Sequence, residues 1–221
     1  MAALTFTLKA ANKQPIDCSG LTPDHLEGKT LKQIQALKLS GTHTVADYFD
    51  VDGDDTHQII FKNTDQSLSN IGHSMSKGLM TIEGDCGDFL GNEIQGGTII
   101  CKGAAGDRVG NKMRRGMILV EGDVGEYCAS TMIAGTIGVL GKAGARLGYG
   151  MKRGTLLLAK MPEPQATWLD CGLHTLPFLK LLFKSFALQD TKFANLKHAR
   201  VRRLMGDVSG MGKAEMLVLQ S

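Results

Sequence analysis

The chain has few aromatic residues: one tryptophan, three tyrosines and eight phenylalanines, about 5% of its 221 residues. We therefore expect a narrow core of methionine, isoleucine, valine and alanine rather than one built around aromatic clusters. Charge of one sign is also scarce, since the formal net charge is only +3. That value is too small to indicate a nucleic-acid-binding protein.

Patterns of metal ligands and nucleophiles are absent as well. The five cysteines form no C-x-x-C pair and no iron–sulfur spacing, and three of them share repeat positions with apolar residues, so we expect buried, reduced thiols. The six histidines show no H-x-H, H-x-x-x-H or H-E-x-x-H pattern, and no serine lies in a nucleophile elbow. We therefore expect no catalytic residue, no cofactor and no metal bound by this chain.

No segment is long and apolar enough to predict a membrane span. The longest apolar stretch, residues 176–188, is interrupted by Lys180 and Lys184. The first eleven residues lack the apolar run of a signal peptide. We expect a cytoplasmic protein that binds neither a membrane nor nucleic acid.

Glycine, by contrast, is abundant at 28 residues, and most of it follows a repeat of 19 residues between Ile71 and Leu158. Positive φ is favourable mainly for glycine, so these glycines are expected at sharp corners. One corner column contains Gly72, Gly91, Gly110 and Gly148, and another contains Gly78, Gly97, Gly116, Gly135 and Gly154. Ala129 replaces a glycine of the first column, which leaves the conformation of that corner open.

Each repeat also contains a strand-like stretch with two apolar columns that should point inward, because side chains alternate along a strand. These columns contain Met80, Ile99, Ile118, Ile137 and Leu156, and Ile82, Cys101, Val120, Val139 and Leu158. The column between them is mixed, which indicates an outer face partly covered by another segment. A fixed short period is typical of a solenoid. We predict an all-β fold, a right-handed parallel β-helix with 19-residue coils, a short N-terminal cap and a C-terminal helical segment.

We expect one domain over residues 1–221, divided into a cap (1–52), the β-helix (53–160) and C-terminal helices with a closing strand (161–221). The cap should contain a strand at residues 4–8 and short helices at 22–26 and 30–37, with Thr22 as the N-cap of the first. Helical spacing predicts a C-terminal helix over 176–186 and a second over 192–205.

The second predicted helix has a basic run. Its exposed cations are expected to include Lys197, Arg200, Arg202 and Arg203. Such a run is either a solvated helix face or a docking surface for an acidic partner or a polyanionic cofactor, and both alternatives stay open. A polar column, His73, Asn92, Asn111 and Ser130, is expected to face outward.

The frame G-x-x-M-x-x-G-x-I-x-V-x-G-x-x-G is clearest at residues 72–87 and 110–125. It resembles the glycine-rich β-helix of the C-terminal domain of the glutamate synthase large subunit and of the C-type subunit of formylmethanofuran dehydrogenase. Three flanking segments, residues 15–23, 168–172 and 212–215, resemble the second family. They are similar in particular to its bacterial form in the formyltransferase/hydrolase complex of methylotrophs.

That resemblance implies a non-catalytic structural subunit of a hetero-oligomer in one-carbon metabolism. Such a complex passes a formyl group from tetrahydromethanopterin to a methanofuran-type carrier and releases formate. The implied partners are an amidohydrolase-like subunit that holds a metal, a formyltransferase subunit and a pterin-oxidoreductase-like subunit. An alternative is a detached β-helix subunit of a glutamate-synthase-type amidotransferase complex. A third, a free-standing binding protein, would need an exposed ladder of aromatic or charged side chains, and we expect none.

Overall fold

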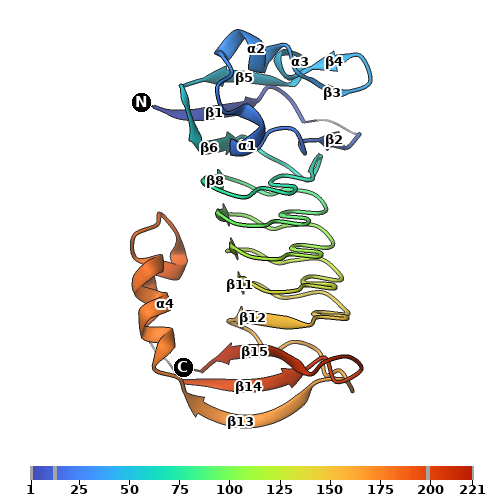
Figure 1. Ribbon diagram of the computed structural model, residues 1–221, viewed down its shortest axis with the longest axis vertical. Helices are drawn as coiled ribbons and strands as arrows, with labels where there is room; N and C mark the ends of the chain where they lie inside the picture. Colours follow the sequence, from blue (N-terminus) through green and yellow to red (C-terminus); the bar gives the residue numbers. More distant parts are fainter. Residues whose placement is uncertain (1, 12–13, 198–199, 221) are drawn as a thin grey trace.

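The computed structural model of the protein describes residues 2–11, 14–197 and 200–220. The molecule is elongated, with the N-terminal elements at one end and the C-terminal strands at the other (Figure 1). Before the repeats the elements are β1 (Ala3–Leu8), β2 (Ile16–Asp17), α1 (Pro23–Leu26), α2 (Leu31–Gln35), β3 (Lys38–Ser40), β4 (His43–Thr44), α3 (Val45–Tyr48), β5 (Phe49–Asp52), β6 (Asp55–Lys62) and β7 (Leu68–Ser69).

The repeats and the C-terminal part supply the remaining elements. Each repeat contributes one strand: β8 (Leu79–Ile82), β9 (Thr98–Cys101), β10 (Met117–Val120), β11 (Thr136–Val139) and β12 (Arg153–Leu158). After them come β13 (Leu169–Thr175), α4 (Phe178–Phe186), the 3₁₀-helix η1 (Lys192–Asn195), β14 (Arg200–Gly206) and β15 (Lys213–Leu219). None of the helices in the described part of the chain is long and apolar enough to cross a membrane.

One mixed sheet of eleven strands runs the length of the molecule, in the order β13-β14-β15-β12-β11-β10-β9-β8-β6-β1-β5. Its centre is parallel, and equivalent residues of successive repeats are direct partners, as Ile99 is with Ile118. The pairs β1–β5, β13–β14 and β14–β15 are antiparallel.

The prediction of a right-handed parallel β-helix is therefore wrong. The described residues form one long mixed sheet with antiparallel strands at both ends. The return path of each repeat contains turns and isolated bridges, such as Ala105 to Val124, instead of a further regular sheet. The physical reason lies in the corners, because so many left-handed backbone conformations within 19 residues leave room for only one strand of regular length.

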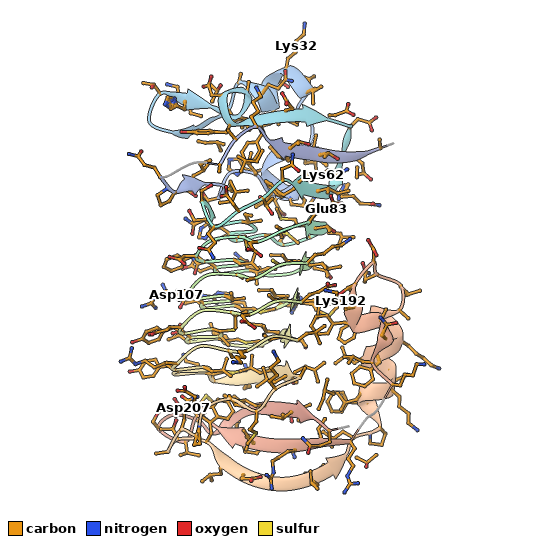
Figure 2. The ribbon with its side chains drawn as sticks, turned by 180° about the vertical axis from the view of Figure 1, so that it is seen from behind. Lys32, Lys62, Glu83, Asp107, Lys192 and Asp207 are labelled. Atoms are coloured by element: carbon orange, nitrogen blue, oxygen red, sulfur yellow. The ribbon has the colours of Figure 1, made fainter. Side chains whose placement is uncertain are left out.

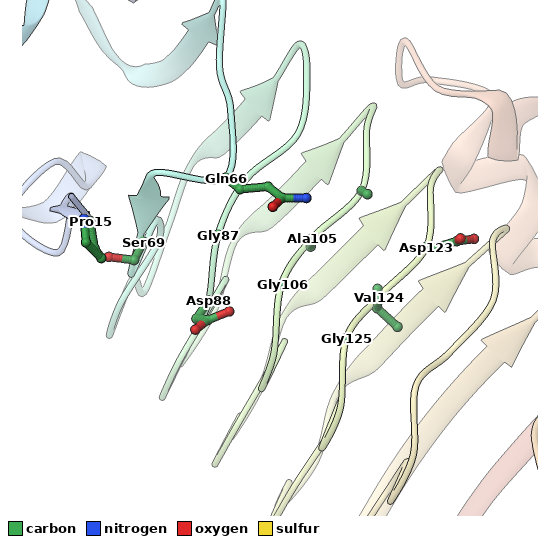
Figure 3. A pocket seen from close by; sticks show the side chains of 11 residues that line it. Pro15, Gln66, Ser69, Gly87, Asp88, Ala105, Gly106, Asp123, Val124 and Gly125 are labelled. Atoms are coloured by element: carbon green, nitrogen blue, oxygen red, sulfur yellow. The ribbon is translucent and has the colours of Figure 1, made fainter. Parts of the chain in front are cut away.

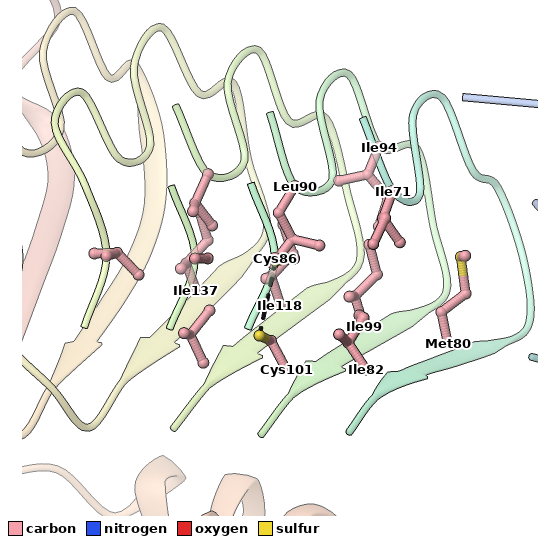
Figure 4. Close-up of a cluster of buried hydrophobic side chains, with 14 of the residues drawn as sticks. Ile71, Met80, Ile82, Cys86, Leu90, Ile94, Ile99, Cys101, Ile118 and Ile137 are labelled. Carbon is pink, nitrogen blue, oxygen red and sulfur yellow. Dashed lines mark hydrogen bonds between the residues drawn. The ribbon is translucent and has the colours of Figure 1, made fainter. Parts of the chain in front are cut away.

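The two inward columns of the strands are buried, as the alternation predicts. They pack with the methionine column of the return path, including Met75, Met113 and Met132, into one continuous core. Figure 4 shows this packing around Cys86, Leu90 and Ile99. Aromatic packing is confined in this core to its N-terminal end, where Phe6 stacks on Phe61 with ring centroids 5.2 Å apart.

The glycine columns occupy left-handed conformations. Gly72 has φ of 74° and Gly116 has φ of 97°, and the other predicted corner glycines also have positive φ. Ala129 has φ of 60°. Its corner therefore keeps the conformation of the glycines in its column, and the open question about that corner is answered.

The N-terminal cap is joined to the first repeat by polar contacts. Thr30 and Gln33 form a capping box at the start of α2, and Pro23 opens α1 after Thr22. The carboxylate of Asp24 accepts hydrogen bonds from the backbone N–H of Ser76, at 2.8 Å, and from its hydroxyl. These contacts cover the sheet end where a bare edge would invite association.

The C-terminal part differs from the expectation. The predicted helix over residues 192–205 is wrong: η1 covers only Lys192–Asn195, and Arg200–Gly206 is strand β14 between β13 and β15. Burial of Val201 between exposed Arg200 and Arg202 shows the two-residue period of a strand. Residues 198–199 of the predicted helix, including His198, lie outside the described residues.

Helix α4 is present and covers the outer face of the sheet. Leu179, Phe183 and Phe186 are buried on one side of it. They form a second core with Ile100 and Leu119 of the strands. The mixed outer column is thus covered, as its composition indicates.

Candidate docking surfaces

A buried carboxylate holds the C-terminal arm, defined here as residues 176–197, against the sheet. The side chain of Glu121, next to β10, is 4% exposed. Its carboxylate accepts hydrogen bonds from the Thr191 hydroxyl at 2.8 Å and from the Lys192 backbone N–H at 2.7 Å. The Lys192 ammonium lies 3.3 Å from the same carboxylate. This contact fixes η1, and through it the position of α4 (Figure 2).

The outward side of the arm combines cations with exposed apolar side chains. Lys180, Lys184 and Lys197 line a shallow groove of about 340 Å³ between α4 and the segment after η1. Leu181 and Leu188 are 70% and 84% exposed. Because large aliphatic side chains rarely stay this exposed on a free surface without a function, the arm is a candidate contact region.

The structure separates the four basic residues singled out from the sequence. Lys197 lines the groove on the arm, and Arg200 is exposed at the start of β14. Arg202 Nε lies 3.3 Å from the carboxylate of Asp170, and Arg203 Nε lies 3.0 Å from that of Glu215. Two of the four cations are therefore engaged within the chain.

Strand β13 is the outermost strand at the C-terminal end of the sheet. Leu169 and Leu173 on this strand are 56% and 50% exposed. A sheet edge with exposed leucines is a template for pairing with another chain unless something covers it. The charged strand β5 at the opposite end has Asp50 and Asp52 exposed instead.

A groove of about 500 Å³ runs along the return path of the repeats (Figure 3). Most of its lining residues are glycine or alanine, and its carboxylates already have partners. Asp88 accepts a hydrogen bond from the backbone N–H of Asp107 at 2.8 Å, and Asp123 accepts one from that of Lys142 at 2.6 Å. These side chains join one repeat to the next and leave little chemistry for a ligand.

The expectation that no exposed ladder exists is wrong. Phe89, Arg108, Tyr127 and Arg146 follow one another at intervals of 19 residues and stack along the edge opposite the arm. The Arg108 guanidinium lies 4.7 Å from the Tyr127 ring centroid. Each contact of this kind stabilises by about 0.5–1 kcal/mol at an exposed site. The signal was present in the sequence as an alternation of aromatic residue and arginine at the repeat period.

The polar column beside this ladder was expected to face outward, and that expectation is also wrong. Asn111 and Ser130 are buried. The Asn111 amide donates to Asn92 Oδ1 at 2.9 Å, and the Asn92 amide donates to His73 Nδ1 at 3.1 Å. The column is an internal hydrogen-bonded stack that satisfies its own polar atoms.

Four of the five cysteines are buried, and Cys171 is exposed. Burial raises the pKa of the Cys128 thiol to about 12 and raises that of Cys18 further. The hydrogen bond with Cys101 and burial together raise the pKa of the Cys86 thiol. No group of three His, Cys, Asp or Glu side chains within the described ranges is arranged to hold a metal ion.

Comparison with known proteins adds one finding. Neither the protein-family models nor the curated proteins include a match to this chain. Among solved structures, the chain is similar to a chain of the formyltransferase/hydrolase complex FhcABCD from Methylorubrum extorquens, which was solved in complex with methylofuran. The sequences are 29% identical, the match covers 98% of this chain and 100% of the other, and the TM-score is 0.64.

That likeness extends over both ends of the chain as well as the repeats. It therefore supports membership of the formyltransferase/hydrolase complex family and, with it, a place in a multi-subunit assembly of one-carbon metabolism.

Proposed function

We propose that this chain is the C-type subunit of a formyltransferase/hydrolase complex, with a structural and non-catalytic role. In this proposal the complex passes a formyl group from tetrahydromethanopterin to a methanofuran-type carrier and releases formate in the cytoplasm. The partner subunits are amidohydrolase-like, formyltransferase and pterin-oxidoreductase-like, and the amidohydrolase-like subunit holds the metal. This chain supplies neither cofactor nor catalytic residue.

The observation that carries the proposal is the end-to-end likeness to a chain of such a complex. Physical features of the surface support it. The arm exposes Leu181 and Leu188, and the edge strand β13 exposes Leu169 and Leu173. Interfaces of permanent complexes are rich in such apolar side chains.

We further propose that the C-terminal basic residues contribute to docking. Lys197 and Arg200 are exposed and available to an acidic partner surface. Arg202 and Arg203 act indirectly, because they fix Asp170 and Glu215 on the C-terminal strands. Rim charges of this kind mainly accelerate and orient association.

The test is purification of the tagged chain from its native host at moderate salt, with identification of the stably bound proteins. We expect an amidohydrolase-like and a formyltransferase subunit in fixed proportion to the chain. The same purification with Lys197→Glu/Arg200→Glu should recover less complex, while Lys29→Glu/Lys32→Glu makes the same charge change at the opposite end and should not. Recovery of the chain alone, from cells in which the other subunits assemble without it, would refute the proposal.

A further inference from the structure

A cavity of about 260 Å³ lies at the C-terminal end of the core. One wall is a row across three neighbouring strands, in which Asp170 of β13 pairs with Leu204 of β14, and Leu204 pairs with Met216 of β15. The segment 161–168, which contains Pro162, Pro164 and Trp168, forms the other wall. The cavity is therefore built from three parts of the chain that are far apart in sequence.

This cavity continues the main core. Trp168, Leu204 and Met216 are 8%, 7% and 1% exposed and belong to that core. The indole ring lies against two glycines: a Cβ on Gly148 would be 2.7 Å from its Cζ2, and one on Gly206 would be 2.6 Å from its Cδ2. The ring has no room to move toward either glycine, so the wall that it forms is fixed before anything binds.

The indole nitrogen lacks a partner among the described residues. Trp168 Nε1 is buried and makes no hydrogen bond to any of them. A buried donor left unpaired costs about 1–3 kcal/mol, and buried tryptophans usually have an acceptor. A group that filled the cavity and offered an acceptor would satisfy this atom and bury further apolar surface at the same time.

Charge at the rim restricts what can enter. Glu163 and Asp170 both line the cavity, and Asp170 is neutralised by Arg202 at 3.3 Å. Glu163 makes no ion pair with any described residue. An anion would meet this carboxylate in a desolvated place, whereas an uncharged group, or one flanked by a cation, would not.

We propose that this cavity is an anchor pocket for one uncharged aliphatic or aromatic side chain of a partner subunit, whose adjoining backbone carbonyl accepts the Trp168 N–H. The volume suits a single side chain, and a partner segment reaching it would also cover Met161 and Leu169, which are 54% and 56% exposed. Buried anchors of this kind contribute a large share of the energy of an interface. The inference rests on the proposed function, because it takes the other subunits of the complex as the partner.

Trp168 is the only tryptophan of the chain, which makes it a specific reporter. We would label the chain with 5-fluorotryptophan, which gives one ¹⁹F resonance, and add the unlabelled complex purified from cells lacking this subunit. The proposal predicts that the resonance shifts on assembly and that the indole N–H signal of a ¹⁵N-tryptophan sample moves downfield. Assembly with both signals unchanged would overturn this inference alone. Failure to assemble would overturn the proposed function together with it.

A variant pair gives an independent test. Leu204→Phe extends a larger side chain into the cavity, and Leu173→Phe makes the same change on the neighbouring strand at an exposed residue outside it. We expect Leu204→Phe to weaken assembly at least tenfold and Leu173→Phe to weaken it much less, with both chains folded by circular dichroism. Equal affinities for the two variants would contradict the pocket, and should Leu204→Phe not fold, the ¹⁹F experiment decides.

Discussion

Gly138 of β11 and Phe193 of η1 occupy adjoining space: a Cβ on Gly138 would lie 2.6 Å from Phe193 Cε1. Gly138 is the one glycine in an outer column otherwise occupied by larger side chains. Its missing side chain receives the ring that fastens the C-terminal arm to the sheet. Sequence position 138 and the arm, more than fifty residues later, therefore form one packing unit.

Gly138→Ala should loosen the arm. The added methyl group meets Phe193 and Leu119, so we expect a loss of about 1–3 kcal/mol in the free energy of unfolding. Chemical denaturation measures this loss, and limited proteolysis reports whether cleavage within residues 176–197 accelerates. Gly20→Ala is the matched control, since nothing lies within 4 Å of the added atom. Equal stability of the two variants would contradict the packing of Phe193 against β11.

Ala129 and Leu156 should be energetically coupled. A Cβ on Gly72, Gly91 or Gly110 would lie 2.3–2.4 Å from the Cδ1 atom of the isoleucine 27 residues later. The corresponding residue for Ala129 is Leu156, which lacks the branch at Cβ. We infer that leucine there is what allows alanine at the corner.

A double-mutant cycle checks this coupling. Leu156→Ile should destabilise the protein with Ala129 in place and do so much less in the Ala129→Gly background. We expect an interaction energy of about 0.5–3 kcal/mol, the range for residues in direct contact. Additive effects of the two substitutions would show that the leucine and the alanine are independent.

Much of the fold follows from the repeat, because a strict period places the inward columns, the corners and the strand register at once. The outer column also predicted a covering segment. What failed was less periodic. The basic run after Lys192 has cations at spacings that suit a helix and a strand about equally, and β14 forms because two neighbouring strands supply its hydrogen bonds.

The candidate sites were less predictable than the fold. The ladder from Phe89 to Arg146 could have been found by comparing every column of the repeat, including polar ones. The cavity at Trp168 could not, since its walls come from residues 161–168 and three strands whose pairing no local pattern specifies. Likewise, only the folded structure shows that Arg202 and Arg203 have carboxylate partners.

The carboxyl group of Asp207 should make stability depend on acid. Burial tends to raise its pKa, but hydrogen bonds from Ser209, at 2.6 Å from the hydroxyl, and from the Gly150 N–H, at 3.0 Å, outweigh this and hold the pKa below its usual value. A lowered pKa in the folded state stabilises the protein above the ordinary aspartate pKa of about 3.9, and the gain is lost as the pH falls through the folded value.

Asp207→Asn should therefore lower the melting temperature near neutral pH and should differ little from the parent at the lowest pH at which both still fold. Thermal unfolding at a series of pH values measures this. Asp52→Asn, at an exposed residue of β5, is the control and should leave the pH profile unchanged. A constant difference between Asp207→Asn and the parent across the whole range would contradict the role of the ionised carboxyl group.

Thiol labelling should distinguish one cysteine from the other four. Cys18, Cys86, Cys101 and Cys128 are buried, and Cys171 is exposed on β13. Because the thiolate is the reactive species and burial disfavours it, a thiol reagent should modify a single cysteine in the native protein and all five after denaturation. Cys171→Ser should abolish native labelling. Rapid modification of a second native thiol would show that the core opens.

The most direct test of the central claim is to delete the gene for this chain in its native host and measure formyl transfer and formate release by the remaining subunits, with and without the purified chain added back. A structural role predicts that the chain alone releases no formate, that the remaining subunits lose assembly and activity, and that adding the chain restores both. Formate release by the chain alone, or full assembly and activity of the complex without it, would contradict the account.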